Sequence, residues 1–150
     1  MRPLAIFSLF LLAACGPEPA PPQPPIVAFR FECAPDTPGS IEQVLEDGFT
    51  ASFGPLEVFE FAYVGPSMDR SGAPAIAFEI ADHQAARFAD LTEAHVGKRL
   101  AIYLDGVFHS APEINERLPG QGIINGGQQG FTVAEFQDLI ERIRAQESSR

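Results

Sequence analysis

The stretch that decides the fold is Arg99-Leu-Ala-Ile-Tyr-Leu-Asp-Gly-Val-Phe-His-Ser110. Residues 99–104 are mostly apolar and aromatic, which is typical of a strand. Asp105-Gly106 supplies two residues that tolerate positive φ, as the tight turn between antiparallel strands requires. Residues 107–110 then form the returning strand. The sequence therefore predicts a β-hairpin in the second half of the chain.

Upstream of this hairpin, the pattern predicts a strand followed by a helix. Residues 75–80 read as the strand, and Asp82 is expected to cap a helix that runs to about His95 and ends at Gly97. Apolar residues recur at helical spacing along that segment. The expected buried stripe consists of Ala85, Phe88, Leu91 and Val96.

Downstream, a short strand through Ile123 and Ile124 precedes a turn at Asn125-Gly126. The last helix is predicted to start at Thr132, because Glu135 stands three residues later and completes a capping box. The apolar stripe expected on this helix consists of Val133, Phe136, Leu139, Ile140 and Ile143.

The region before residue 73 gives weaker signals. Alternating patterns predict strands over residues 26–32 and 58–64, and residues 65–72 are expected to form a loop. Residues 40–46 are predicted to form a short helix capped by Ser40. We therefore assign residues 26–72 to N-terminal strands and a loop, and residues 73–146 to the main domain.

The first residues resemble an export signal. An apolar run after Arg2 ends in two alanines, and it is shorter than the roughly 20 residues that span a bilayer. Residues 12–15, Leu-Ala-Ala-Cys, are similar to the lipobox of bacterial lipoproteins. That resemblance implies a signal peptide at residues 1–14 and acyl chains on Cys15. The alternative is an ordinary secreted protein with a cysteine at the cleavage point.

Residues 15–25 contain the predicted lipidated cysteine and a proline-rich tether, since six prolines in residues 16–25 exclude a helix or a central strand. The protein is expected in the cell envelope, anchored by lipid and facing the periplasm. In the lipoprotein family an aspartate after the cysteine often marks inner-membrane retention, so Gly16 favours the outer membrane.

The charge of the chain excludes nucleic acid as a partner. The full chain carries 20 acidic and 10 basic residues, a formal charge of −10, and removal of Arg2 with the signal leaves 9 basic residues and a charge of −11. Binding to phosphate backbones requires a basic patch. With Cys15 lipidated, Cys33 has no partner in the chain and is buried, free or bonded to another molecule.

Several segments together resemble one family. Residues 74–79, 86–92, 96–107, 110–114 and 131–135, with the glycine pair at 126–127, are similar to the head of the first periplasmic region of SecD, a subunit of the preprotein translocase. The resemblance covers about residues 73–145. It implies an α+β fold, with an antiparallel or mixed sheet and two main helices packed on one face.

The resemblance also implies contact with extended or unfolded polypeptide. Two differences from SecD limit what the resemblance implies. The chain shows none of SecD's transmembrane helices after the signal, and SecD's base domain is unrecognisable in residues 26–72. The expected function is a non-enzymatic module that binds extended polypeptide or an envelope protein, with the translocase as a candidate partner. The alternatives are a passive scaffold or assembly lipoprotein and a hydrolase of envelope polymers.

No residue pattern predicts catalysis, a metal site or a cofactor. The carboxylate pairs are explained by solvation, the histidines lack the close spacing of metal ligands, and the glycines after residue 119 lack the P-loop lysine. Ser110 has only the neighbouring His109 as a base, and strand neighbours point to opposite faces. The best candidates for lining a groove that accepts apolar segments are Phe59, Phe61 and Phe108.

Overall fold

The computed structural model describes residues 25–127 and 130–147. The predicted signal peptide, Cys15 and nearly all of the tether lie outside these residues. The α+β fold class is confirmed, with antiparallel strands and two helices. The elements are β1 (Val27–Phe31), β2 (Ile41–Val44), β3 (Thr50–Phe53), β4 (Phe61–Met68), β5 (Pro74–Ile80), α1 (Asp82–Ala94), β6 (Leu100–Leu104), β7 (Val107–Ser110), β8 (Gln121–Asn125) and α2 (Val133–Glu147).

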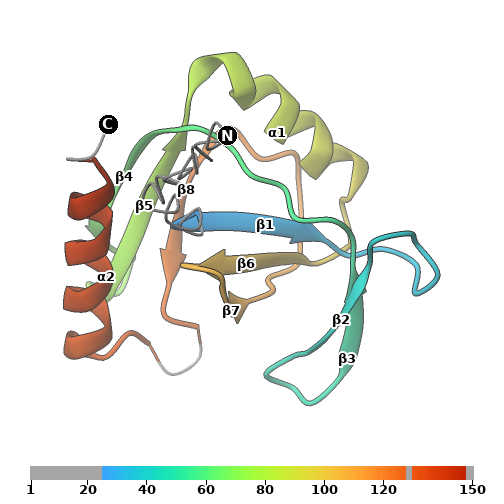
Figure 1. Ribbon diagram of the computed structural model, residues 1–150, viewed down its shortest axis with the longest axis horizontal. Coiled ribbons are helices and arrows are strands. Elements are labelled where there is room, and N and C mark those ends of the chain that lie inside the picture. Colours follow the sequence, from blue (N-terminus) through green and yellow to red (C-terminus); the bar gives the residue numbers. More distant parts are fainter. Residues whose placement is uncertain (1–24, 128–129, 148–150) are drawn as a thin grey trace, which may run out of the picture.

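The strands of the described residues form three antiparallel sheets. Their orders are β1-β6-β7, β4-β5-β8 and the hairpin β2-β3. In Figure 1 the strands of the first sheet run across the direction of the second, and the β2-β3 hairpin projects away from both. Helix α1 lies along the top of the molecule in this view, and α2 lies beside β4 and β5.

The predicted hairpin at residues 99–110 is confirmed. Asp105 and Gly106 have φ values of 52° and 78°, the left-handed conformation at both central positions that a type I′ turn requires. The strands pair Leu104 with Val107 and Tyr103 with Phe108. A register irregularity then places Ser110 opposite Ile102, so the end of β7 bends out of the regular ladder.

One hydrophobic core joins the two larger sheets and both helices. Its centre is Phe29 of β1, which is fully buried and contacts the rings of four other phenylalanines. These come from the segment before β4, from β4, β5 and α1: Phe59, Phe61, Phe78 and Phe88. From α2, the same core receives Leu139, Ile140 and Ile143.

A second, smaller cluster lies on the other face of the β1-β6-β7 sheet. Ala28 of β1 and Tyr103 of β6 form its base, and Leu45 and Phe53 of the β2-β3 hairpin cover them. Phe108 of β7 packs at its margin. The hairpin is thereby fixed against the outer face of the sheet.

The helix prediction for residues 40–46 is wrong, because these residues include β2. Ser40 does not cap a helix, and its hydroxyl instead donates to Pro35 O. Gly48 has a φ of 82°, and the N–H of Leu45 donates to Phe49 O at 2.8 Å. The Asp47-Gly48 turn therefore closes a hairpin. The apolar residues of this segment are spaced as in a helix, which explains the wrong prediction.

The strand predicted over residues 58–64 begins later, at Phe61, and continues to Met68 into the expected loop. Pro66 is tolerated within it because β4 is an edge strand, where no donor is needed on the open side. The actual turn lies at residues 69–73. Asp69 Oδ1 accepts hydrogen bonds from the N–H groups of Ser71 and Ala73, which stops the strand there.

Helix α1 begins as predicted but without the expected cap. Its N-cap residue is Ala81, with no side-chain hydrogen bond, and Asp82 lies in the first turn. Phe88 of the predicted stripe is buried and Ala85 and Leu91 are half-buried, but Val96 lies beyond the end of the helix and is 48% exposed. Ala89 and Thr92 complete the buried face.

Helix α2 carries the predicted capping box. Thr132 Oγ1 donates to Glu135 Oε2 at 2.6 Å, and the N–H of Glu135 donates back to Thr132 Oγ1 at 3.2 Å. The predicted stripe is buried at Leu139, Ile140 and Ile143, but Val133 is 69% exposed. The helix packs through its middle and C-terminal turns.

We expect Thr92→Val to destabilise the fold by about 2 kcal/mol, although the two side chains have similar size. The fully buried Thr92 hydroxyl donates to Ala89 O and accepts the N–H of Leu118, both at 2.9 Å. Valine leaves that N–H without its partner. Urea denaturation measures the loss, and Thr50→Val on the exposed start of β3 is the control. Equal stability of both variants and the wild type would contradict this role.

The capping box should make stability depend on pH. The hydroxyl and backbone N–H of Thr132 lower the pKa of Glu135 below its ordinary value of 4.5. The stabilisation is therefore present above that value and is lost as the pH falls through the lower folded-state pKa. Glu135→Gln should be less stable than the wild type at pH 7, and the difference should shrink towards pH 3 in urea denaturation. Glu141→Gln controls for the loss of one acidic charge from α2.

Candidate functional site

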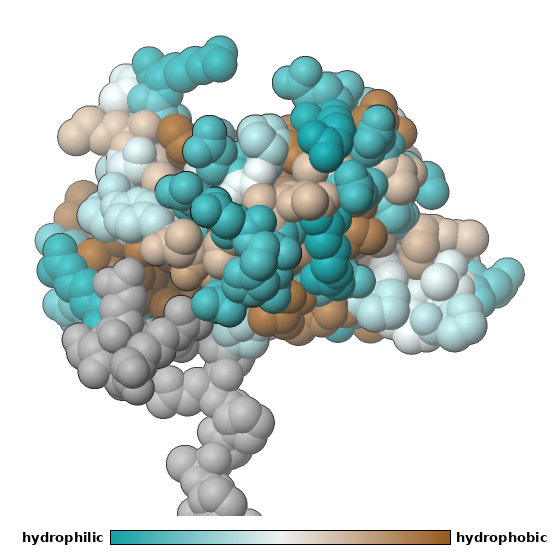
Figure 2. All heavy atoms as spheres, turned by 90° about the horizontal axis from the view of Figure 1, so that it is seen from above, coloured by the Kyte–Doolittle hydropathy of each residue, from teal (hydrophilic) through white to brown (hydrophobic). Residues whose placement is uncertain are grey.

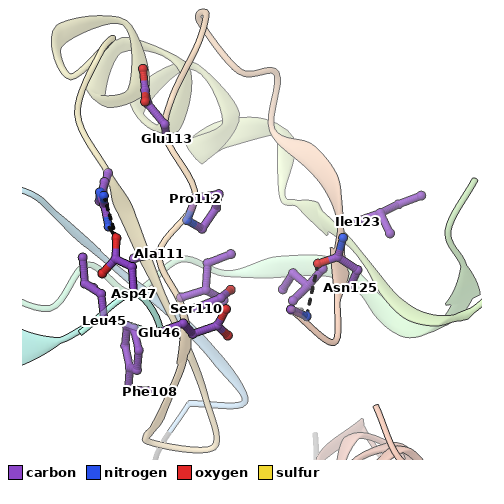
Figure 3. A pocket seen from close by; sticks show the side chains of 14 residues that line it. Leu45, Glu46, Asp47, Phe108, Ser110, Ala111, Pro112, Glu113, Ile123 and Asn125 are labelled. Atoms are coloured by element: carbon purple, nitrogen blue, oxygen red, sulfur yellow. Dashed lines mark hydrogen bonds and ion pairs between the residues drawn. The ribbon is translucent and has the colours of Figure 1, made fainter. Parts of the chain in front are cut away.

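A groove of about 550 Å³ lies between the two larger sheets. One side comes from β6 and β7 through Ile102, Phe108 and Ser110, and the opposite side is the end of β8. Residues 45–47 of the β2-β3 turn close the lower part beside Ala111, and Pro112 and Glu113 form the upper rim (Figure 3). The groove thus combines segments that are distant in the sequence.

The floor of the groove is apolar. Leu45, Ile102 and Ile124 line it, and each is less than 10% exposed. The half-buried ring of Phe108 stands at the side and makes an edge contact with Tyr103, with 5.8 Å between the ring centroids. An apolar side chain entering the groove would therefore find a prearranged hydrophobic surface.

A histidine bridge connects the two sides. His109 Nε2 donates to Asn125 O at 2.6 Å, and the His109 ring stacks on Phe131 with centroids 5.1 Å apart and planes at 6°. Because this nitrogen is hydrogen-bonded to a carbonyl on β8, it does not act on Ser110. Within the described residues, the imidazole of His109 serves to hold β7 against β8.

The rim is predominantly acidic. Glu46, Asp47 and Glu113 line the groove together with a single cation, Arg99. The Arg99 guanidinium bonds Asp47 Oδ2 at 3.2 and 3.3 Å. A hydrogen bond from the backbone N–H of Phe49, assisted by Arg99, lowers the pKa of Asp47. The rim therefore holds three carboxylates against one guanidinium at neutral pH.

The open edge of β8 also borders the groove. Gly122 and Ile124 lie opposite Phe78 and Ile76 of β5, and the N–H of Ile80 donates to Gly120 O at 2.6 Å. In an antiparallel ladder, hydrogen-bonded positions alternate. The backbone groups of Gly120, Gly122 and Ile124 therefore face β5, while those of the residues between them face the open side.

The carbonyl of Asn125 on this open side is taken by His109. Ile123, two residues back along β8, keeps both backbone groups without a partner among the described residues. Its side chain is 56% exposed and points away from the other labelled side chains in Figure 3. The edge therefore presents backbone hydrogen-bonding groups beside an apolar groove.

The structure does not bring the three predicted groove residues together. Phe108 lines the groove. Phe59 is 4% exposed and packs edge-on against Phe88, with the Arg87 guanidinium 4.7 Å from its ring centroid. Phe61 is half-buried against the same core. Alternation along the sequence indicated a shared strand face but did not indicate that this face points into the protein.

Sequence reasoning missed most of the groove. The sequence predictions place Glu46 in a helix and Ile123 in a strand, and they give Glu113 no role. The signals present in the sequence were the two turns that place them, Asp47-Gly48 and the bend at Ala111-Pro112. Neither turn shows by itself that these loops meet.

A second hollow of about 480 Å³ lies on the other side of Glu46 and His109, where Phe131, Leu139 and Arg142 line it. Residues 25–127 and 130–147 contain no group of three or more His, Cys, Asp or Glu side chains arranged to hold a metal ion. Cys33 is a half-buried free thiol. Neither of the described helices is long and apolar enough to cross a membrane. The face seen in Figure 2, which α1 covers, is largely hydrophilic with scattered apolar side chains.

Comparison with known proteins identifies one family. Residues 59–146 match the profile described as SecDF, P1 head subdomain. The match includes β4, and so extends upstream of residue 73, where the resemblance in the sequence began. It confirms the head-like region and leaves the predicted lipobox untested.

The relatives are SecD proteins. The chain is 39% identical over 99 residues to the protein translocase subunit SecD of Sebaldella termitidis, covering 63% of this chain and 23% of that protein. It is 44% identical over 83 residues to the SecD of Aquifex aeolicus, covering 55% and 16%. The aligned region thus spans less than a quarter of either relative.

The fold is also found in solved structures. A structure of SecDF, described as a membrane component that enhances protein export, superposes with a TM-score of 0.55 and 21% identity, covering 77% of this chain and 60% of that one. SecDF in its super-membrane-facing form gives a TM-score of 0.54 at 22% identity, covering 77% and 18%. At this identity the likeness concerns the fold.

Proposed function

The chain belongs to the family of the SecDF P1 head subdomain, and from this premise we propose that it is a non-enzymatic envelope module that binds extended polypeptide and assists protein export. Its relatives are translocase subunits, and one solved relative is described as enhancing export. From these relatives the proposal takes only the process in which the protein acts, which is protein export. The site itself is argued from this chain's own groove.

The observation that carries the proposal is the apolar groove beside an open strand edge. An extended peptide satisfies its own backbone by pairing with such an edge, and its alternate side chains then enter the neighbouring groove. Here the unpartnered backbone groups of Ile123 lie next to a floor formed by Leu45, Ile102 and Ile124. Backbone pairing tolerates many sequences, as a module that meets many exported chains requires.

We further propose that Cys15 anchors the protein to a membrane. Acyl chains gain about 0.8 kcal/mol per buried methylene, and more than one chain is needed for stable anchoring. The proline-rich residues after Cys15 would space the domain from the lipid. Anchorage would hold the groove near a membrane, and Gly16 is the feature that favours the outer membrane.

Site-specific photo-crosslinking in intact cells tests the polypeptide-binding proposal. A probe at Phe108, which lines the groove, or at Ile123, which flanks a segment paired with β8, should capture many different exported chains. A probe at Ala86, exposed on the α1 face, should capture few. Identification is by mass spectrometry. A single repeated envelope protein at both groove positions would instead make the module a scaffold subunit and would retire the export role.

Metabolic labelling tests the anchor. The wild type should incorporate a labelled fatty acid and sediment with membranes, whereas Cys15→Ser should do neither. Cys33→Ser is the matched control, since it removes the other cysteine of the chain and should retain both properties. An unlabelled wild type recovered in the soluble fraction would contradict lipid anchorage.

A further inference from the structure

The charges around the groove are not balanced. The guanidinium of Arg99 donates two hydrogen bonds to Asp47. The backbone of Arg99 forms a β-bridge with Glu113 in the wall of the groove. Within residues 25–127 and 130–147, the carboxylates of Glu46 and Glu113 form no ion pair. The groove therefore keeps two negative charges that no side chain of the described protein neutralises.

These charges lie at different places along the groove. In Figure 3, Glu113 is at the upper rim beside Pro112, and Glu46 is at the lower part beside Ser110. The β8 edge with Asn125 stands across from both. A segment lying along that edge would pass between the acidic rim and the backbone groups of Ile123.

We propose that the groove selects extended segments in which an arginine or lysine accompanies apolar side chains, and that these segments add to β8 as a further antiparallel or parallel strand. This selectivity rests on the proposed polypeptide binding and names its substrate class. The apolar side chains contact the floor, and the cation meets Glu46 or Glu113. Acidic segments are repelled by the same two carboxylates.

The strand geometry sets the length of the segment. On the open side of β8, Ile123 keeps both backbone groups, whereas the N–H of Gln121 donates to Pro119 O and the carbonyl of Asn125 accepts from His109. The paired part of the segment is therefore about three residues, roughly 10 Å at about 3.3 Å per residue. Successive side chains alternate between the two faces, so an arginine and its apolar neighbours at alternate positions share one face. Backbone hydrogen bonds to β8 come from every second residue of the segment.

The experiment uses the purified full chain and three fluorescent peptides of about nine residues. Each alternates valine and serine around a central arginine, glutamine or glutamate. We expect fluorescence anisotropy at low salt to give tightest binding for arginine, with about a fivefold step to glutamine and a further step to glutamate. At 1 M salt the differences should largely disappear, because the Debye length falls to about 3 Å.

A pair of matched double variants separates the local effect from net charge. Glu46→Gln with Glu113→Gln should make the affinities for the arginine and glutamate peptides equal. Glu93→Gln with Glu141→Gln removes the same charge from exposed positions of α1 and α2 and should preserve the discrimination. Loss of discrimination in both double variants would overturn a specific role for the groove.

Strand addition has its own readout. N-methylation of the arginine peptide at one alternate set of residues should abolish binding, and N-methylation at the other set should leave it intact. Equal tolerance of both sets would overturn strand addition. Equal binding of all three unmodified peptides would overturn the charge selectivity while the proposed polypeptide binding stood. Failure of all three to bind would overturn both.

Discussion

The ring of Phe29 is the contact on which the rest of the structure depends. It lies at the middle of β1, is fully buried, and touches phenylalanines from the second sheet, from the segment before it and from α1. Since the two larger sheets share no strand, burial of aromatic surface is what holds them together. The groove exists because this contact joins the sheets on one side and leaves their edges separate on the other.

Local interactions then fix the positions of the two strand edges, β7 and β8, that border the groove. The type I′ turn at Asp105-Gly106 aims β7, and the hydrogen bond from His109 to Asn125 fixes its distance from β8. Phe131, in the segment before α2, supports the same corner, because the imidazole stacks on its ring and the ring contacts Phe136 of α2. A binding surface built from fixed elements loses little conformational entropy when a flexible segment docks. Most of that cost then falls on the polypeptide.

Local signals predicted the fold well where the chemistry is local. The Asp105-Gly106 turn and the Thr132 capping box required only neighbouring residues, and the structure confirms both. The helix expected over residues 40–46 failed because a short amphipathic strand and a short helix place apolar residues at overlapping intervals. The groove could not be predicted at all, because Leu45 and Ile124 become neighbours only through packing. The burial of Phe59 was equally unpredictable, because it depends on contact with Phe88 of α1.

The open edge of β8 carries a risk as well as a use. An unpaired edge beside apolar surface can recruit a second copy of the same chain. Short length limits this, and so does charge: each copy carries −10 and would bring its own Glu46 and Glu113 against those of its partner. Like charges facing each other across a groove disfavour self-pairing more than they disfavour a neutral or basic segment. The acidic rim that defines the proposed substrate therefore also serves to keep the edge free.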